Sequence, residues 1–263
     1  MQPLKRFVKY LDGRLLNHRI MLIRDLIYTS QPLRLSNSSS IDKAFHVNLG
    51  HSQNLFALLC HRFGSDKGSS STRQGEHLLK RAVHNYADFY SLLFDNLRPN
   101  IGSVFECGIG TNNEGLISNM GALGRPGASL RVWREYFPNA QVVGVDIDPD
   151  TLFEEDRIRT FEMDQTDPVS IQNTLEKIEI KQFDLIVDDG LHTFQAARTL
   201  FENLITRLSL DGTYVIEDVN PWDVRKFENY FKDSVFTTYF VHLIRKGTSL
   251  GDNSLVVIRR RQV

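Results

Sequence analysis

Apolar and polar positions follow one pattern near the start of the chain and another after residue 100. In residues 1–34, leucine and valine recur at three- and four-residue spacing with basic residues between them, which predicts an amphipathic helix. From residue 101 onward, short β-branched or aromatic runs alternate with segments of helix length. The runs predicted to be strands are residues 103–106, 141–146, 157–162, 183–188 and 213–217.

This alternation of strands and helices predicts a parallel sheet. Runs such as FDLIVDD and GTYVIED are nearly continuous in apolar character, as expected of strands that are buried on both faces. A helix over 221–232 and two further strands, 235–241 and 254–259, are expected to close one edge, partly antiparallel. The predicted fold class is α/β: a Rossmann-like, doubly wound, mostly parallel seven-stranded sheet with an N-terminal helical extension.

The predicted organisation has three segments. Residues 1–62 form a helical arm that packs on its own domain, contacts another subunit or lies on a membrane surface. Residues 63–100 supply a lid and a helix ahead of the core, because the small polar stretch at 68–75 is typical of a loop that closes on a ligand. Residues 101–263 form the core domain.

Composition and charge narrow the function classes. The net charge of −1 gives no overall attraction to nucleic acid or anionic lipid, and 41% hydrophobic residues exclude global disorder. The seven basic against two acidic residues of 1–34 leave peripheral membrane contact open. With two cysteines, no apolar run long enough to span a membrane and no secretory signal, we expect a reduced, cytoplasmic location.

The first predicted strand ends in a glycine turn suited to a cofactor. Glu106, Gly108 and Gly110 form an E-x-G-x-G turn, where missing side chains let the backbone approach a ligand. Asn113 stands where a dinucleotide fingerprint would continue with glycine or alanine, so a nicotinamide cofactor is disfavoured.

The next two strand ends extend this cofactor site. Asp146 can accept hydrogen bonds from both hydroxyls of a ribose, or it can be a helix N-cap. Asp164 or Gln165 can bind an adenine edge, while Asp167 is expected to cap a helix that starts at Pro168.

Acidic residues gather at the fourth and fifth strand ends. Asp188, Asp189, Glu217 and Asp218 would repel one another there unless a cation balances them, and oxygen ligands of this kind suit Mg²⁺ or a similar ion. His192 is close enough to accept a proton from a metal-bound hydroxyl, although a structural role stays open.

Two segments outside these strand ends are further candidates. The long segment between the first two strands places Ser129 and Arg131 near the far end of the cofactor, unless it is an ordinary surface insertion. Tyr86 and Tyr90 can present their rings to a sugar, or they are core aromatics on one helix face.

Taken together, ECGIG, VDID and DQTD resemble the cofactor motifs of class I S-adenosylmethionine-dependent methyltransferases over roughly residues 100–220. The set GASLRVWREYFPNA, DQTD, DDGLH and IEDVN, with FGSDKG and HNYADFYSLLF upstream, is similar to one family of them. That family is the metal-dependent sugar O-methyltransferases of the macrolide (mycinamicin) and rhamnosyl-tetracenomycin type.

The resemblance implies methyl transfer from S-adenosylmethionine to a sugar hydroxyl of a glycoside or glycan. It implies Asp189, Glu217 and Asp218 as ligands of Mg²⁺ or a similar divalent ion and His192 as the base. The cofactor would be bound by Glu106, Gly108, Gly110, Ser129, Asp146, Asp164, Gln165 and Asp188. Acceptor and lid contacts would come from Asp66, Lys67, Tyr86 and Tyr90.

The expected partner is a sugar-bearing small molecule or glycan, and a homo-oligomer is expected. Two other interpretations stay open: a catechol-type small-molecule O-methyltransferase, and a non-catalytic nucleotide-binding or scaffold protein. A nucleic-acid methyltransferase is disfavoured because the core lacks a basic stripe. A two-histidine iron oxygenase is disfavoured because the site offers one obvious histidine.

Overall fold

The computed structural model describes residues 44–48, 54–68, 84–122, 124–244 and 252–261. The chain divides into residues 1–42 and residues 43–263, and every described residue belongs to the second unit. The helix expected over 1–34 and most of the loop at 68–75 lie outside the described residues. No helix in the described ranges is long and apolar enough to cross a membrane.

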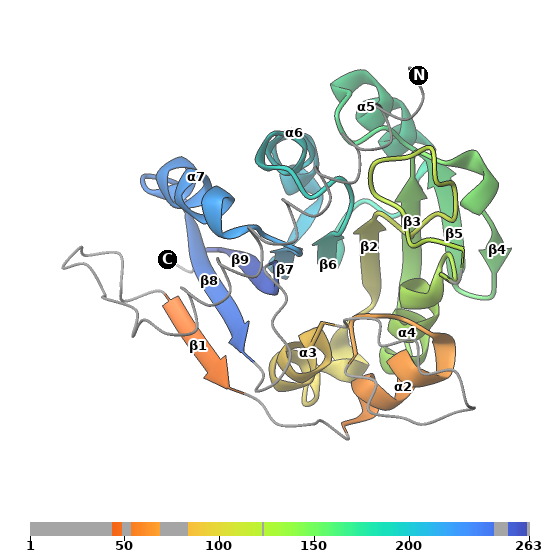
Figure 1. Cartoon of the computed structure of the whole chain (residues 1–263), viewed down its shortest axis with the longest axis horizontal. Helices are drawn as coiled ribbons and strands as arrows, with labels where there is room; N and C mark the ends of the chain where they lie inside the picture. Colours follow the sequence, from red (N-terminus) through yellow and green to blue (C-terminus); the bar gives the residue numbers. More distant parts are fainter. Residues whose placement is uncertain (1–43, 49–53, 69–83, 123, 245–251, 262–263) are drawn as a thin grey trace, which may run out of the picture. The chain divides into compact units, whose positions relative to one another are not determined.

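The described strands form one nine-stranded sheet in the order β1-β8-β9-β7-β6-β2-β3-β5-β4 (Figure 1). Neighbours from β7 through β6, β2 and β3 to β5 are parallel, while β9 runs antiparallel to both β7 and β8. The strands are β1 Ala44–Asn48, β2 Ser103–Cys107, β3 Gln141–Asp146, β4 Glu154–Glu155, β5 Ile158–Glu162, β6 Phe183–Asp188, β7 Leu208–Ile216, β8 Phe236–Ile244 and β9 Ser254–Arg260.

The α/β fold with a mostly parallel sheet is confirmed, but the expected number of seven strands is wrong. The two additional strands lie at opposite edges: β1 pairs parallel with β8, and the two-residue β4 pairs antiparallel with β5. The turn between β4 and β5 contains Arg157 at φ 59°, a left-handed conformation that usually calls for glycine. Because no glycine or asparagine stands there, the sequence carried no hairpin signal.

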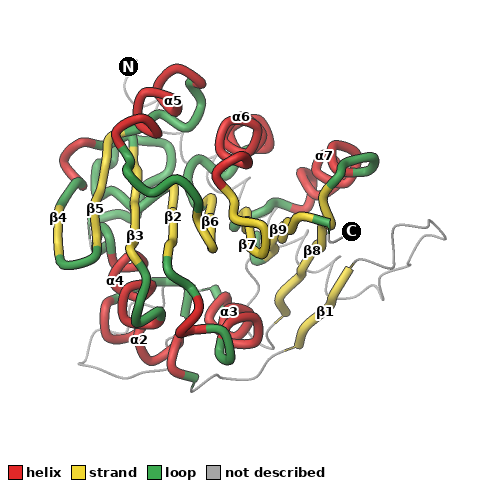
Figure 2. The backbone as a smooth tube through the Cα atoms, turned by 180° about the vertical axis from the view of Figure 1, so that it is seen from behind, coloured by secondary structure: helices red, strands yellow, loops and turns green. Residues whose placement is uncertain are grey.

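Helices cover both faces of the sheet. Figure 2 shows α2, α3 and α4 on one side and α5, α6 and α7 on the other. Two clusters of buried apolar residues fill the two interfaces, one on each side. The helices are α2 Leu55–Phe63, α3 Tyr86–Phe94, α4 Ala128–Tyr136, α5 Pro168–Lys177, α6 Phe194–Leu204 and α7 Pro221–Phe231, with short 3₁₀ turns at Arg98–Asn100, Pro149–Thr151 and Ile205–Arg207.

Local sequence signals explain several helix boundaries. The expected cap at Asp167 is confirmed: its side chain accepts a hydrogen bond from Val169 N, and Pro168 is the first residue of α5. In α2, Asn54 caps the start by accepting from Ala57 N at 2.8 Å. Gly64, at φ 83°, ends the same helix.

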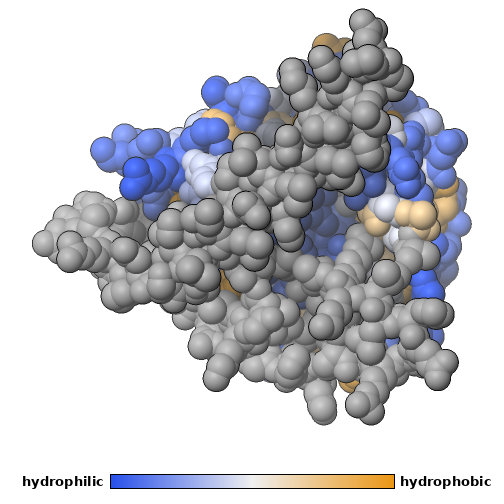
Figure 3. Space-filling model, viewed as in Figure 1, coloured by the Kyte–Doolittle hydropathy of each residue, from blue (hydrophilic) through white to orange (hydrophobic). Residues whose placement is uncertain are grey.

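The strand order locates the ligand site. From the central β2 the chain continues to β3 and β5 on one side, and later to β6 and β7 on the other. The order therefore reverses between β2 and β6, and ligands of such sheets bind outside the carboxyl ends of the strands at that point. Where described residues are visible in Figure 3, they are mainly hydrophilic, with a few apolar residues among them.

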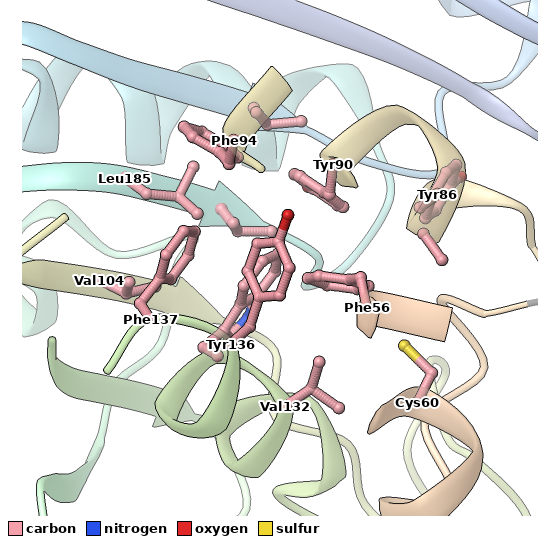
Figure 4. Packing of buried hydrophobic residues seen from close by; sticks show 14 of the residues in the cluster. Phe56, Cys60, Tyr86, Tyr90, Phe94, Val104, Val132, Tyr136, Phe137 and Leu185 are labelled. Atoms are coloured by element: carbon pink, nitrogen blue, oxygen red, sulfur yellow. The ribbon is translucent and has the colours of Figure 1, made fainter. Parts of the chain in front are cut away.

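An aromatic cluster holds α2 and α3 against α4 below this point (Figure 4). The ring centroid of Phe56 lies 4.9 Å from those of Trp133 and Tyr136 and 5.4 Å from that of Tyr90. All four rings are buried. The helices ahead of the first core strand are thus joined to the sheet by aromatic packing.

Replacing the central ring should therefore be costly. We expect Phe56→Ala to lower the free energy of unfolding by about 3–5 kcal/mol, because it leaves a cavity among aromatic rings. The matched control is Leu58→Ala in the same helix, where the side chain is 55% exposed and the change should stay within about 0.5 kcal/mol. Denaturant titration of both variants measures the difference, and equal losses would contradict the packing described.

Candidate active site

The glycine turn after β2 packs closely on the turn after β6. Gly108 and Gly110 have φ of 85° and 86°. A Cβ atom on Gly108 would lie 2.1 Å from the backbone oxygen of Asp189. No other residue type fits between the two turns, so this glycine is what lets the cofactor-side and acidic strand ends come together.

Asp146 holds the glycine turn from β3. Its two carboxylate oxygens accept hydrogen bonds from Ile109 N at 2.9 Å and Asp148 N at 3.1 Å. Burial raises the pKa of Asp146, and these backbone N–H groups oppose the rise. The N-cap of the following 3₁₀ turn is Asp148, so the alternative of Asp146 as that cap is wrong.

Gln165 and Asp188 form a second polar pair at the strand ends. Gln165 Nε2 donates to Asp188 Oδ1 at 2.9 Å, and Gln165 Oε1 accepts from Leu191 N at 2.6 Å. Asp188 Oδ2 is buried without a hydrogen-bond partner, and burial raises the pKa of Asp188 to about 6. Asp164 instead closes a turn by accepting from Thr166 N.

Lys67 lies among three carboxylates. Its side chain is 2% exposed, and Nζ lies 2.6 Å from Asp189 Oδ2, 3.1 Å from Glu106 Oε1 and in contact with Glu217 Oε2. The pKa of Lys67 is raised well above its usual range: burial opposes the charge, but the surrounding carboxylates outweigh it. Lys67, which was predicted to contact the acceptor or form part of a lid, is therefore a buried cation inside the site.

Both oxygens of Glu217 are occupied by protein donors. Tyr90 OH donates to Oε1 at 2.5 Å, and Lys67 Nζ donates to Oε2. Burial raises the pKa of Glu217, and the Lys67 ammonium acts in the opposite direction. Glu217 therefore shares its donor Lys67 with Asp189, and the two carboxylates lie on the same side of the site.

Asp189, His192 and Asp218 form a group whose possible ligand atoms all lie within 4.8 Å of one another. His192 Nε2 lies 3.2 Å from Asp189 Oδ1, and His192 Nδ1 lies 3.7 Å from Asp218 Oδ2. Tyr86 OH donates to Asp218 Oδ1 at 2.5 Å. The two carboxylates supply oxygen ligands of the kind that suit a hard divalent ion, and the imidazole of His192 lies beside them.

The backbone is strained at this group. His192 and Asp218 adopt φ of 56° and 52°, in the left-handed region that non-glycine residues rarely occupy. Such conformations cost of order 1–3 kcal/mol each and cluster at functional sites. In these conformations the side chains of His192 and Asp218 both lie close to that of Asp189.

A cavity of about 320 Å³ connects the glycine turn to this group. Among the predicted residues it is lined by Asp66, Lys67, Tyr86, Gly108, Gly110, Ser129, Asp189, His192, Glu217 and Asp218. The fold thus brings the glycine turn and the acidic strand ends to one space.

Some predicted residues lie elsewhere. Asp146, Gln165 and Asp188 are not among the lining residues and face the adjoining strand ends. Tyr90 is fully buried in the aromatic cluster, in agreement with the alternative that it is a core aromatic. Arg131 bonds Glu155 through Nη2 at 2.7 Å and packs on Phe153, away from the cavity.

The lining residues that were not predicted include His84 and Met120. His84 has Nδ1 3.4 Å from Asp218 Oδ1, and its ring stacks on Tyr86. The side chain of Met120 packs against Gly110: a Cβ atom on this glycine would lie 2.1 Å from the sulfur of Met120. The HNY sequence was a signal for His84, because it precedes the helix that carries Tyr86, whereas nothing in the sequence indicated Met120.

The charge state of His192 provides a test of this geometry. Burial opposes the imidazolium, but the hydrogen bond to Asp189 and the charge of Asp218 outweigh it and raise the pKa of His192 to about 10. Protonated His192 therefore stabilises the fold below about pH 6.5, the ordinary value, and this contribution is lost as the pH rises towards 10.

We expect NMR titration of the metal-free protein to show His192 protonated well above pH 8. Asp189→Asn should lower the pKa of His192, because it removes the charge of a direct partner. A His192 that titrates near 6.5 in the unmodified chain would contradict the ion pairs described.

Comparison with known proteins gives partial matches. No family model matches the chain. It is 32% identical over 159 residues to the 8-demethyl-8-alpha-L-rhamnosyl tetracenomycin-C 2'-O-methyltransferase of Streptomyces olivaceus, covering 60% of this chain and 39% of that protein. It is 38% identical over 93 residues to the mycinamicin VI 2''-O-methyltransferase of Micromonospora griseorubida, covering 35% and 23%.

Among solved structures, the MycE methyltransferase from the mycinamycin biosynthetic pathway, in complex with Mg, SAH and mycinamycin VI, matches with a TM-score of 0.58 at 21% identity. That match covers 79% of this chain and 53% of the other, and it shows a shared fold. The chain spans about two fifths or less of the length of the curated relatives it matches. By sequence and by fold, the chain is related to the S-adenosylmethionine-dependent sugar O-methyltransferases of macrolide and tetracenomycin biosynthesis.

Proposed function

We propose that this chain transfers a methyl group from S-adenosylmethionine to a hydroxyl group of a sugar, with the help of Mg²⁺ or a similar divalent ion. The observation that carries the proposal is the single cavity that joins the Gly108–Gly110 turn to Asp189, His192 and Asp218. A methyl donor at the turn and an acceptor at the acidic group would meet there.

The residues at the turn fit the cofactor. Gly108, Gly110 and Ser129 all line the cavity, so that backbone and a hydroxyl group border the space for the cofactor. Asp146 would bind the ribose hydroxyls, and the unpartnered Asp188 Oδ2, beside Gln165, is an acceptor for an amino group of adenine. When bound, S-adenosylmethionine supplies an electrophilic methyl group on a positively charged sulfur.

The acidic group fits a divalent ion. Asp189 and Asp218 would hold it, and Glu217, which shares Lys67 with Asp189, is a further candidate ligand. Such an ion lowers the pKa of a coordinated hydroxyl. A cation bound to Asp189 and Asp218 would also offset the negative charge that raises the pKa of His192, so that neutral His192 could accept the hydroxyl proton.

The reaction balances with these roles. The acceptor oxygen forms a bond to the methyl carbon as the carbon–sulfur bond breaks, and the sulfur keeps the electron pair. The hydroxyl proton passes to His192. Asp189 orients the imidazole through the 3.2 Å contact to Nε2.

The direct test is to incubate the protein with labelled S-adenosylmethionine, Mg²⁺ and separate acceptors: rhamnosides, other deoxysugar glycosides and a catechol. We expect label in a sugar product, loss of labelling with a chelator and recovery with Mg²⁺. Label in the catechol alone would overturn the sugar acceptor, and labelling unaffected by chelation would overturn the metal.

We expect Asp146→Ala to weaken binding of S-adenosylhomocysteine by about 1–3 kcal/mol, through the loss of charge-assisted hydrogen bonds. Asp150→Ala, an exposed carboxylate in the same loop, is the control and should bind normally. Calorimetry without metal measures both. An unchanged affinity of Asp146→Ala would place the ribose elsewhere.

We expect His192→Ala to lower the rate of methyl transfer by about 10²–10⁴, because it removes the proton acceptor. Binding of Mn²⁺ and S-adenosylhomocysteine should change far less. The exposed His61→Ala is the control. If single-turnover rates of His192→Ala stay near normal, solvent accepts the proton and His192 serves only to orient Asp189.

A further inference from the structure

Lys67 stands at the meeting point of three strands. The carboxylates around its ammonium come from β2 (Glu106), from the turn after β6 (Asp189) and from the end of β7 (Glu217). Two of these three acids, Glu106 and Glu217, are fully buried. Burying several carboxylates together is unfavourable unless a cation accompanies them.

The position of Lys67 is built into the fold. Its backbone oxygen accepts from Ala87 N at 2.8 Å, in the first turn of α3, and its N–H reaches Ser65 Oγ at 3.4 Å. The next residue, Gly68, leaves no room for a Cβ, which would lie 2.5 Å from that of Cys60. The ammonium is therefore delivered to the strand ends by a segment anchored to α2 and α3.

The three carboxylates also have the geometry of a cation site. Their nearest oxygens converge on the single point that Nζ occupies, at up to 3.1 Å. Bonds from oxygen to Mg²⁺ or Ca²⁺ measure about 2.0–2.6 Å, so a small inward shift would suit a divalent ion. Asp189 belongs both to this set and to the Asp189, His192 and Asp218 group.

We propose that Lys67 is the resident cation of a second cation site, formed by Glu106, Asp189 and Glu217, and that it restricts this protein to one divalent ion at Asp189 and Asp218. Lys67 is thus a positioning residue. Its ammonium group holds Asp189 between the second cation site and the Asp189, His192 and Asp218 group, and it also holds the carboxylate of Glu106. The ion at Asp189 and Asp218 rests on the proposed function, whereas the second site rests on the contacts of Lys67.

The test counts Mn²⁺ ions bound per chain, from the electron paramagnetic resonance signal of free Mn²⁺ during titration. Lys67→Ala empties the position of the ammonium and should raise the count from one to two. Lys67→Met removes the charge but fills the space, and it should bind one. The control, Lys177→Ala at an exposed position of α5, should match the unmodified chain.

The Mn²⁺ counts test the second cation site and the metal ion of the proposed function separately. A folded Lys67→Ala chain that binds the same number of ions as the unmodified chain would overturn the second site. An unmodified chain that binds no Mn²⁺ would overturn the metal of the proposed function, while a gain of one ion in Lys67→Ala would still support the second site. If Lys67→Ala folds only when Mn²⁺ is added, judged by circular dichroism, the proposal is supported, and failure of Mn²⁺ to restore folding contradicts it.

Discussion

The buried ammonium of Lys67 is the contact on which the site depends. Neighbouring parallel strands bring Glu106, Asp189 and Glu217 together at their carboxyl ends, and this convergence of negative charge is costly without a compensating cation. A core built from the sheet alone would not contain that cation. The chain supplies it from the segment between α2 and α3, so the helices ahead of β2 are part of the site.

The aromatic cluster explains how this contact is kept in place. Trp133 from α4 packs edge to face against Phe56 from α2 and Tyr90 from α3, and the rings of Phe56 and Tyr90 stack on each other. Two of the cluster's polar atoms also reach the acids: Trp133 Nε1 donates to Glu106 Oε2 at 3.0 Å, and Tyr90 OH donates to Glu217. Trp133 and Tyr90 therefore both pack in the cluster and hydrogen-bond a buried carboxylate, so a substitution in the cluster also alters the surroundings of Glu106 and Glu217.

Strain is concentrated where the chemistry is proposed. His192 and Asp218 both occupy the left-handed region, and their side chains approach each other and Asp189 from two separate turns. Such conformations persist only where the surrounding structure holds them. Here the glycine turn against Asp189 and the two hydrogen bonds between Tyr86 and Asp218 do so.

The sequence by itself determined the α/β class, the main strands and the acidic residues that end them, because buried parallel strands need continuous apolar runs and their polar ends follow directly. It also indicated the Asp167 cap, a local signal. Only the tertiary structure decided that Tyr90 is buried, that Glu217 is bonded by Lys67 and that His84 lies beside Asp218. It also revealed the edge strands β1 and β4. All of these except β4 depend on contacts between segments far apart in the chain, which no local pattern of residues encodes. Strand β4 pairs with the adjacent β5, but its turn lacks the glycine or asparagine that would have indicated a hairpin.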